Sequence, residues 1–258
     1  MTIRILGVRI DNLKKNEILA KIAFFLTDGK QHLIFTPNPE MLVDASRDSH
    51  FQEILNAGDL NICDGRGIEL MAKMKIERLA GVDLLLEICA LAEKTGKTIY
   101  FLGSGDISGL EKLAKNIKSL HPNLAIAGYH PGPKLTLKKF GNSTVLNDDE
   151  EENKLVVNDI IRKSPDILFV AFGHPKQEKW ISKNISRLPS IKIAMGVGGA
   201  FDYLSGKTRR APRWVRRRGF EWLWRLGREP KRIGRIFKAI VVFPFLVIFK
   251  NKSSNKIV

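Results

Sequence analysis

Short apolar runs alternate with amphipathic stretches over residues 3–206 of the chain. The apolar runs are rich in β-branched and aromatic residues, as strands are, and they read IRILGVRI, HLIFT, LNIC, TIYFLG, LAIAGYH, DILFVAFG and IKIAMGVGG. The stretches between them place apolar residues at helical spacing, in KNEILAKIAFFLTDG, EMLVDASRDSHFQEILNAG, GVDLLLEICALAEKTG, SGLEKLAKNIKSL and PKQEKWISKNISRL. Strands that are apolar along nearly their whole length, separated by helices, indicate a mostly parallel sheet with helices on both faces. We therefore predict an α/β, Rossmann-like fold.

Residues 131–153, PGPKLTLKKFGNSTVLNDDEEEN, interrupt this alternation with proline, glycine, asparagine and an acidic run. We predict that they form an exposed insertion. The acidic side chains are interpreted as part of a solvated loop in preference to a set of metal ligands.

A second change of composition, near Gly206, divides the chain. Residues 207–238 contain 13 Lys or Arg and 2 Asp or Glu, which is +11 of the formal net charge of +16. Residues 1–206 are close to neutral, so the basicity belongs to one segment, and this concentration indicates a specific anionic partner. We predict a Rossmann-like catalytic core over residues 1–206 and a basic, aromatic, helical appendage over residues 207–258.

Apolar residues 239–249, AIVVFPFLVIF, follow the basic segment. As a helix they span about 16 Å, roughly half of the hydrocarbon core of a bilayer, and Pro244 is expected to break that helix. We therefore expect no membrane crossing. Two interpretations remain, which are a segment lying in a membrane interface and a core helix packed on the main domain. The adjacent basic residues favour the interface of an anionic membrane.

Composition and the N-terminal residues bound the class of protein. With 44% hydrophobic and 27% charged residues, the chain is excluded from the disordered and fibrous classes. The first residues, MTIRILGVRIDNL, lack the long apolar region of a signal peptide, and none is predicted. Cys63 and Cys89 lie in apolar surroundings, so no disulfide is expected and a reducing cytoplasm is favoured.

Polar and glycine-rich segments follow the predicted strands, where ligands bind in open α/β sheets. FTPNPE places Thr36 and Asn38 after the second strand, and ICDGRGIEL places Asp64 after the third. Asp64 has two interpretations. It is either a general base that accepts a proton from a substrate hydroxyl or the N-cap of a helix that starts near Gly67.

The segment FLGSGDISGL follows the fourth strand. Gly103 and Gly105 resemble the start of a dinucleotide fingerprint at a helix N-terminus, but Ser108 occupies the position of its third glycine. NAD binding is therefore not favoured. Two interpretations remain for this segment, which are a contact with a phosphate or sugar and a structural turn.

Three further candidates follow the sixth and seventh strands. Gln177 and Glu178 in GHPKQEKW suit a nucleobase or sugar hydroxyls, and Asp202 in GVGGAFDYLSG has a similar role, but acidic residues are also routine in a first helical turn. The five histidines lack metal-site spacing, and the chain has no Gly-x-Ser-x-Gly, Walker lysine loop or Asp-x-Asp. No metal ion is predicted.

The arginines of the basic segment are candidates for holding a diphosphate without a metal ion, because a guanidinium binds phosphate oxygens bidentately. A helix is expected to start at Pro230, which places Arg232 and Arg235 on one face, with Arg225 before it. The tryptophans of the segment suit a membrane interface; they are Trp214, Trp222 and Trp224. Nucleic-acid binding is the alternative. No nucleic-acid motif accompanies the segment, so no nucleic-acid partner is expected.

Taken together, these motifs resemble the WecG/TagA/CpsF glycosyltransferases, glycosyltransferase family 26. The resemblance covers nearly the whole chain, through TPNPE, DGRGIEL, ERLAGVDLL, FLGSG, GHPKQEKW, GVGGAFDYLSGK and the tail RAPRWVRRRGFEWLWRLGREPKRIGRIF. It implies inverting transfer of an N-acetylmannosamine-type sugar from a UDP donor to undecaprenyl-diphospho-N-acetylglucosamine. The product would serve a bacterial cell-surface polysaccharide or teichoic acid. The resemblance implies no metal ion and no cofactor.

The resemblance also implies roles for single residues. Asp64 corresponds to the proposed catalytic base. The substrate-binding residues of the family correspond here to Thr36, Asn38, Arg78, Gln177, Arg225, Arg232 and Arg235. Of these, the three tail arginines correspond to residues thought to hold the diphosphate, and the role of Arg78 is defined only loosely.

In this family the tail closes over the pocket at the cytoplasmic membrane surface, and the core forms homo-oligomers. We therefore expect a peripheral enzyme on the cytoplasmic face of the membrane. The chain departs from the family pattern at Pro37, Pro39 and Ser205 and in the longer insertion, none of which touches Asp64. The alternative within the same family is a different UDP-hexose donor or a different acceptor, and the insertion is the feature that would accompany a different acceptor or partner. A non-enzymatic membrane adaptor is the alternative class, and it would need neither the polar strand ends nor Asp64.

Overall fold

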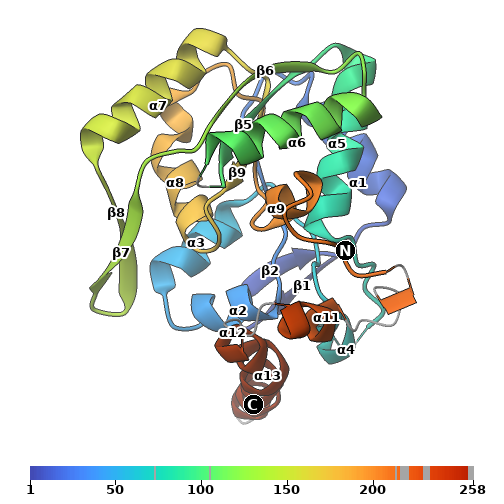
Figure 1. The fold of residues 1–258 in the computed structure, drawn as a ribbon. Coiled ribbons are helices and arrows are strands. Elements are labelled where there is room, and N and C mark those ends of the chain that lie inside the picture. Colours follow the sequence, from blue (N-terminus) through green and yellow to red (C-terminus); the bar gives the residue numbers. More distant parts are fainter. Residues whose placement is uncertain (73, 105, 213, 216–220, 229–232, 255–258) are drawn as a thin grey trace.

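The sheet at the centre of the molecule has six parallel strands (Figure 1). The computed structural model describes residues 1–72, 74–104, 106–212, 214–215, 221–228 and 233–254. Across the sheet the strand order is β4 (Leu60–Asn61), β3 (His32–Phe35), β10 (Ile193–Gly196), β9 (Ile167–Ala171), β5 (Thr98–Gly103) and β6 (Ala125–His130). Every neighbouring pair is parallel, so all the carboxyl ends lie at one edge of the sheet.

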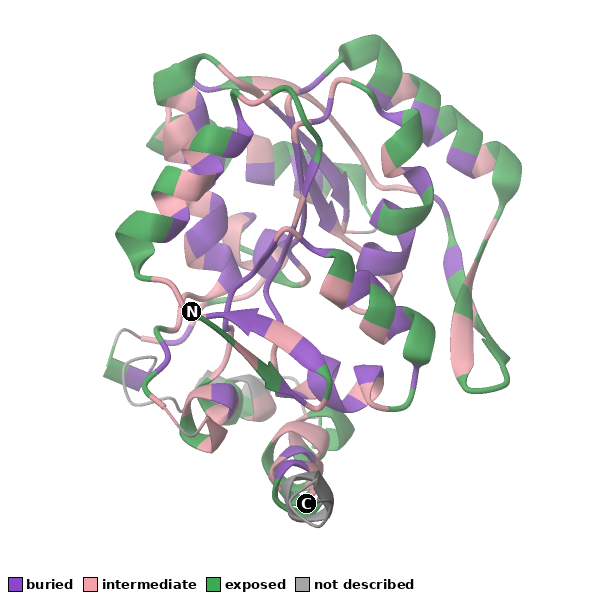
Figure 2. Cartoon of the chain, turned by 180° about the vertical axis from the view of Figure 1, so that it is seen from behind, coloured by how far each residue is buried: buried purple, intermediate pink, exposed green. Residues whose placement is uncertain are grey.

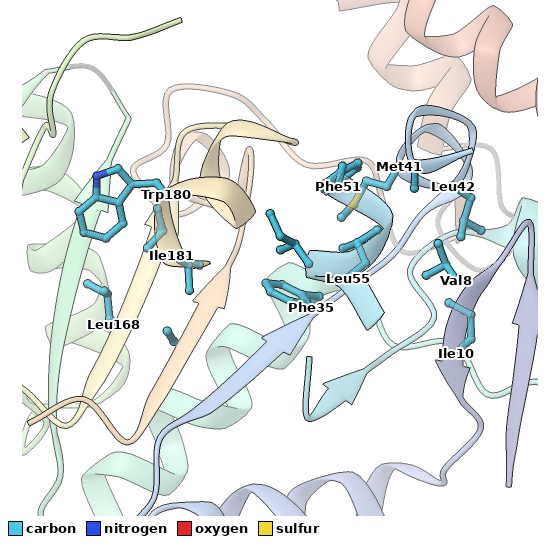
Figure 3. Packing of buried hydrophobic residues seen from close by; sticks show 14 of the residues in the cluster. Val8, Ile10, Phe35, Met41, Leu42, Phe51, Leu55, Leu168, Trp180 and Ile181 are labelled. Atoms are coloured by element: carbon cyan, nitrogen blue, oxygen red, sulfur yellow. The ribbon is translucent and has the colours of Figure 1, made fainter. Parts of the chain in front are cut away.

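Helices cover both faces of this sheet, and each face has its own hydrophobic core. The first core involves α2 (Pro39–Ala45), α3 (Ser49–Ala57), α7 (Glu150–Lys163) and α8 (Lys176–Asn184). The second involves α1 (Lys15–Phe25), α5 (Gly81–Thr95), α6 (Ile107–Leu120) and α9 (Ala200–Leu204). Buried residues line both faces of the central strands (Figure 2), and Figure 3 shows the first core. The predicted α/β class with helices on both faces is confirmed.

The first predicted strand does not join this sheet. It forms an antiparallel hairpin of β1 (Thr2–Ile5) and β2 (Val8–Asp11). The chain reverses at Leu6 and Gly7, where φ is +50° and +85°, a backbone region that favours glycine. Asp11 joins the hairpin to the sheet, because its carboxylate accepts a hydrogen bond from the Asn61 N–H at 2.8 Å.

Two predicted helical stretches are each divided. The first becomes α2 and α3, because Asp48 ends the intervening turn by accepting a hydrogen bond from the Phe51 N–H at 3.0 Å. The second becomes α8 and a short 3₁₀ helix, η1 (Ile185–Arg187). The spacing of apolar residues continues across both breaks, so it does not reveal where one helix ends and the next begins.

The predicted exposed insertion at residues 131–153 is confirmed in its exposure, but these residues form secondary structure in place of a loop. They contain an antiparallel hairpin of β7 (Leu135–Phe140) and β8 (Ser143–Asp148), and their acidic run begins α7. Asp149 caps that helix by accepting hydrogen bonds from the Glu151 and Glu152 N–H groups, both at 3.0 Å. Acidic side chains in a first turn are favourable at the positive end of the helix dipole, which explains the run without metal ions.

Three lysines of α8 anchor this hairpin. Lys176 donates to the Leu135 carbonyl at 2.8 Å, and Lys183 pairs with Asp148 at 2.6 Å. Lys179 is 2% exposed, and its ammonium lies 3.0 Å from Asp48 and also donates to a carbonyl of β8. The lysines in KQEKWISK therefore join the insertion to the core.

Replacing Lys179 by alanine is expected to lower the free energy of unfolding by about 3 kcal/mol, because it leaves the Asp48 carboxylate buried without its counter-ion. Urea denaturation measures this change. Lys154→Ala is the matched control, since the side chains of Lys154 and its partner Glu151 are 47% and 81% exposed and such pairs contribute about 1 kcal/mol or less. Equal effects of the two substitutions would contradict the anchoring role of Lys179.

The described residues at the end of the chain are helical, and the last helix continues past Pro244. It comprises α11 (Glu221–Arg228), α12 (Ile233–Phe237), the π-helical turn η3 (Lys238–Val242) and α13 (Phe243–Ser254). The expected break at Pro244 is wrong, because the π turn η3 runs directly into α13 and Pro244 is the second residue of that helix. Its missing N–H falls where the backbone hydrogen bonding passes from the π to the α pattern. The expected start of a helix at Pro230 lies outside the described residues. None of the described helices has the length and apolar composition needed to span a membrane.

One side of the terminal helix packs on the core. Phe243 and Val247 are buried in the first hydrophobic core, next to α2 and to α4 (Arg66–Met71). Other apolar residues of α13 remain exposed; they are Phe245, Ile248 and Phe249. The core-helix interpretation therefore describes one side of this segment. The boundary at Gly206 stays a prediction, although Ala211 and Val215 beyond it are also buried.

Candidate functional site

Asp64 lies where β4 ends, between two other chain segments. Its N–H donates to the Pro37 carbonyl at 2.9 Å, which joins the segments that follow β4 and β3. Its Oδ2 accepts a hydrogen bond from the N–H of Gly81, the first residue of α5, at 3.2 Å. The positive end of the helix dipole favours a carboxylate there. Asp64 is half-buried, so it keeps contact with the surface.

The N-cap interpretation of Asp64 is wrong for the helix that follows it. That helix, α4, has Gly65 at its N-cap position, without a side-chain hydrogen bond. Asp64 instead reaches across to α5, which begins far along the chain. The carboxylate therefore accepts a hydrogen bond from a backbone donor of another element, and its role as a general base stays a prediction.

Thr36 shares this corner of the sheet edge with Asp64. A Cβ added at Gly81 would lie 3.0 Å from Thr36 Oγ1 and 3.6 Å from Asp64 Oδ2. The hydroxyl and the carboxylate therefore approach the same point at the start of α5. Thr36 is buried, with 9% exposure. The two predicted site residues are brought together by the structure.

Asn38 has a structural task in the same segment. Its Oδ1 accepts a hydrogen bond from the Met41 N–H at 3.1 Å, which caps α2. The amide oxygen is therefore already engaged within the protein. Contact between Asn38 and a sugar stays a prediction.

The glycines after Asp64 permit close packing against the terminal helix. Gly65 has φ +123°, and a Cβ on it would lie 2.9 Å from Pro39 Cδ. A Cβ on Gly67 would lie 2.8 Å from Pro39 Cγ and 3.8 Å from a ring carbon of Phe243. The terminal helix α13 is thus seated directly on the segment that carries Asp64.

Charged residues surround this corner. Burial raises the pKa of the Cys63 thiol to about 12, with the carboxylates of Asp64 and Glu69 adding to the effect and the Arg78 guanidinium opposing it. Arg78, predicted in the site, therefore lies within electrostatic range of the residue that precedes Asp64. An undissociated thiol at this position is no nucleophile at neutral pH.

The start of the basic segment is attached to the same helix end. Arg210 forms a bidentate ion pair with Asp83 in the first turn of α5, with distances of 2.6 and 2.7 Å. Sequence reasoning missed this contact, because nothing in the pattern relates the two positions. Trp224 of α11 donates to the Arg209 carbonyl at 3.4 Å, so the described parts of the segment also contact one another.

Gln177 and Glu178 are buried in the first turn of α8, which follows β9. Gln177 Oε1 accepts from the Gly173 N–H at 3.1 Å and the Gly198 N–H at 2.9 Å, and its Nε2 donates to Glu178 Oε1 at 2.7 Å. The amide therefore joins the segments that follow β9 and β10. Burial raises the pKa of Glu178, whose Oε2 has no hydrogen-bond partner among the described residues. Direct contact of either residue with a substrate stays a prediction.

The remaining candidates lie at separate places. Gly103 has φ +111°, and a Cβ there would lie 2.8 Å from the backbone of Ala171, which supports the structural-turn interpretation. Gly105 lies outside the described residues. Asp202 belongs to the first turn of α9, and its Oδ1 lies 3.6 Å from Lys207 Nζ.

The tail arginines are described in part. Arg235 of α12 lies against α2, with its Nε and Nη2 each 2.8 Å from Glu40 Oε2. Arg225 belongs to α11, but its side chain lies outside what is described, and so does Arg232 as a whole. Among the described residues, no group of three or more His, Cys, Asp or Glu is arranged to hold a metal ion.

A family profile and individual proteins of known name both match nearly the whole chain. The profile described as "Glycosyl transferase WecG/TagA/CpsF family" matches residues 3–257. An N-acetylglucosaminyldiphosphoundecaprenol N-acetyl-beta-D-mannosaminyltransferase of Bacillus subtilis (strain 168) is 33% identical over 254 residues, covering 96% of this chain and 87% of that protein. The protein of the same name from Staphylococcus aureus (strain MRSA252) is 28% identical over 258 residues, covering 98% and 94%. That of Bacillus spizizenii is 31% identical over 216 residues, covering 82% and 77%.

Proposed function

Because the chain belongs to the WecG/TagA/CpsF family of glycosyltransferases, we propose that it transfers N-acetylmannosamine from a UDP donor to the N-acetylglucosamine of a lipid-linked diphosphate, with inversion at the anomeric carbon. The names of the relatives supply the sugar and the acceptor, and the family resemblance supplies the UDP carrier. The observation that carries the proposal is the carboxylate of Asp64, fixed at the start of α5 beside Thr36.

In the proposed reaction Asp64 takes the proton of the acceptor hydroxyl. The hydroxyl oxygen forms the new bond to the anomeric carbon as the bond from that carbon to the UDP oxygen breaks, and UDP leaves with the electron pair. The Gly81 N–H, 3.2 Å from Asp64 Oδ2, holds the carboxylate in one orientation during the transfer. No proton donor or metal ion is required in this scheme, because UDP is a stable anion when positive charge neutralises it.

The tail supplies that positive charge in the proposal. Arg225, Arg232 and Arg235 contact the diphosphate, whose developing negative charge is the feature best stabilised by fixed donors. Seating of Phe243 next to Gly67 supports this role, since it brings the tail to the segment that carries Asp64. Gly103, Gln177, Glu178 and Asp202 remain candidates for the outer parts of the donor site.

We also propose that α13 rests in the interface of an anionic membrane, on its cytoplasmic face, where a lipid-linked acceptor is found. The support is a cluster of exposed apolar side chains opposite the packed side of the helix. Phe245 and Phe249 are 54% and 55% exposed, and their ring centroids are 4.2 Å apart. The neighbouring basic segment adds attraction to anionic headgroups.

Replacing both Phe245 and Phe249 by aspartate is expected to weaken binding to phosphatidylglycerol-containing vesicles at least about tenfold, because each buried phenyl ring contributes roughly 1.5–3 kcal/mol. Vesicle cosedimentation measures the affinity. Leu155→Asp on α7 is the control, since Leu155 is 69% exposed on a different helix. Unchanged binding of the double variant would contradict the interfacial role of α13.

The stereochemical outcome tests the proposed reaction. The protein is incubated with UDP-N-acetyl-α-D-mannosamine and a short-chain lipid-diphospho-N-acetylglucosamine, and the disaccharide is examined by NMR. A single displacement gives a β-linked product. An α-linked product would require a different mechanism and would overturn the role proposed for Asp64.

A further inference from the structure

An acidic side of α2 faces a basic side of the tail. Glu40 and Asp44 are four residues apart, and Arg235 and Lys238 are three apart, so each pair shares one side of its helix. Arg235 Nε and Nη2 are each 2.8 Å from Glu40 Oε2, and Lys238 Nζ is 2.6 Å from Asp44 Oδ1. α12 and α2 lie side by side in Figure 1, and η3 continues along the same helix.

His174, from the segment after β9, lies between these pairs. Its Nε2 is 3.3 Å from Asp44 Oδ2 and 3.6 Å from Glu40 Oε2, and its Nδ1 is 3.4 Å from Arg235 Nη2. Nε2 thus faces the two carboxylates, and Nδ1 faces the guanidinium. One imidazole thus joins the segments after β3 and β9 to the tail.

The network is partly withdrawn from water. The side chains of His174 and Glu40 are 10% and 16% exposed. Burial raises the pKa of Asp44, but hydrogen bonds from His174 and Lys238 outweigh burial and lower it below the usual value. Asp44 is therefore ionised at neutral pH and holds both partners.

Arg235 is held by one edge only. Glu40 and His174 occupy its Nε and Nη2, whereas Nη1 has no hydrogen-bond partner among the described residues, and the side chain is 46% exposed. A guanidinium carries five N–H donors in a planar fork and can bind anions at more than one edge. One held by an inner edge offers its outer edge to a second anion in a fixed direction.

We propose that Glu40 and His174 are positioning residues for Arg235, which they hold so that its outer edge meets the diphosphate of the departing UDP. This inference rests on the proposed function. Neither residue touches substrate; each acts through the guanidinium. A fixed guanidinium needs no reorganisation as negative charge develops on the leaving group, so the loss on removing its support appears mainly in kcat.

The test is a double-mutant cycle on acceptor-dependent UDP release, with Glu40→Ala, Arg235→Ala and the pair combined. Glu40→Ala is expected to lower kcat about tenfold to a hundredfold, and to have no further effect once Arg235 is alanine. Lys238→Met is the matched control, because it breaks the other ion pair between the tail and α2 but leaves Arg235 in place. It should stay within about threefold of wild type.

Hydrogen exchange of α12 and α13 separates positioning from anchoring. Protection of these helices should be alike in Glu40→Ala and Lys238→Met, although only the first loses turnover. Equal turnover losses in these two variants, or a full extra loss in the Glu40→Ala/Arg235→Ala pair, would overturn the positioning role with the proposed function intact. A wild-type protein that releases no UDP would instead refute the proposed function, and the positioning role with it.

Discussion

Asp64→Asn is expected to lower turnover by about a hundredfold to ten-thousandfold, the usual contribution of a general base. Asparagine has nearly the same shape, and its amide oxygen still accepts the hydrogen bond from the Gly81 N–H that Oδ2 accepts at 3.2 Å. The site therefore keeps its geometry but cannot take the proton of the acceptor hydroxyl. Initial rates of UDP release measure the loss, and calorimetric binding of UDP should be nearly unchanged.

Asp149→Asn provides the control for that result. Asp149 is also an aspartate at the start of a helix, where it caps α7 through the Glu151 and Glu152 N–H groups. It lies in the insertion, away from the segment of Asp64, so the substitution should leave turnover within about threefold. Comparable turnover in Asp64→Asn and wild type would show that another group, or none, takes the proton.

Phe243→Asp is expected to lower turnover at least about tenfold by displacing the tail. Phe243 is fully buried between α2 and α4, next to Gly67. An ionised carboxylate buried there would lose hydration worth several kcal/mol. In this variant α13 is therefore more stable when it is detached from the core than when it is packed on it. Its detachment also separates Arg235 from Glu40. The loss is measured with a short-chain acceptor in the absence of membranes, together with hydrogen exchange of α13.

Val241→Asp is the comparison for Phe243→Asp. Val241 is 48% exposed in η3, two residues from Phe243 on the same continuous helix. The same charge placed on the outer side should leave the tail seated and turnover within about threefold. If Phe243→Asp exposed α13 to exchange without loss of turnover, the tail would not contribute to the reaction.

The sheet could be predicted because its physical cause is local. The segments IYFL of TIYFLG and ILFV of DILFVAFG are buried at every position, and only a strand covered on both sides buries both sets of side chains. The hairpin of β1 and β2 was misassigned because IRILGVRI is predicted as one strand of the sheet, although Arg4 and Arg9 alternate with its apolar residues. Only the left-handed backbone at Leu6 and Gly7 turns it away from the sheet.

The sequence could identify which residues belong to the candidate site, but it could not show which of them contact one another. Thr36 and Asp64 follow neighbouring strands, so their meeting follows from the topology. The donor that holds Asp64 is a backbone N–H of Gly81, which no side-chain pattern can show. Gln177 was predicted to bind substrate from its residue type and from the family resemblance, and that contact stays a prediction. The hydrogen bonds of its amide atoms within the protein could not be read from the sequence. Arg235 was identified by its charge, but its direction depends on Glu40 and His174, which belong to distant segments.

Acceptor-dependent release of UDP tests the central claim most directly. Purified protein is mixed with UDP-N-acetylmannosamine and a short-chain lipid-diphospho-N-acetylglucosamine in the presence of EDTA, beside Asp64→Ala. If Asp64 is the base for glycosyl transfer, the wild-type protein releases UDP only when the acceptor is present, and Asp64→Ala releases almost none. UDP release that ignores the acceptor, or that survives in Asp64→Ala, would contradict it.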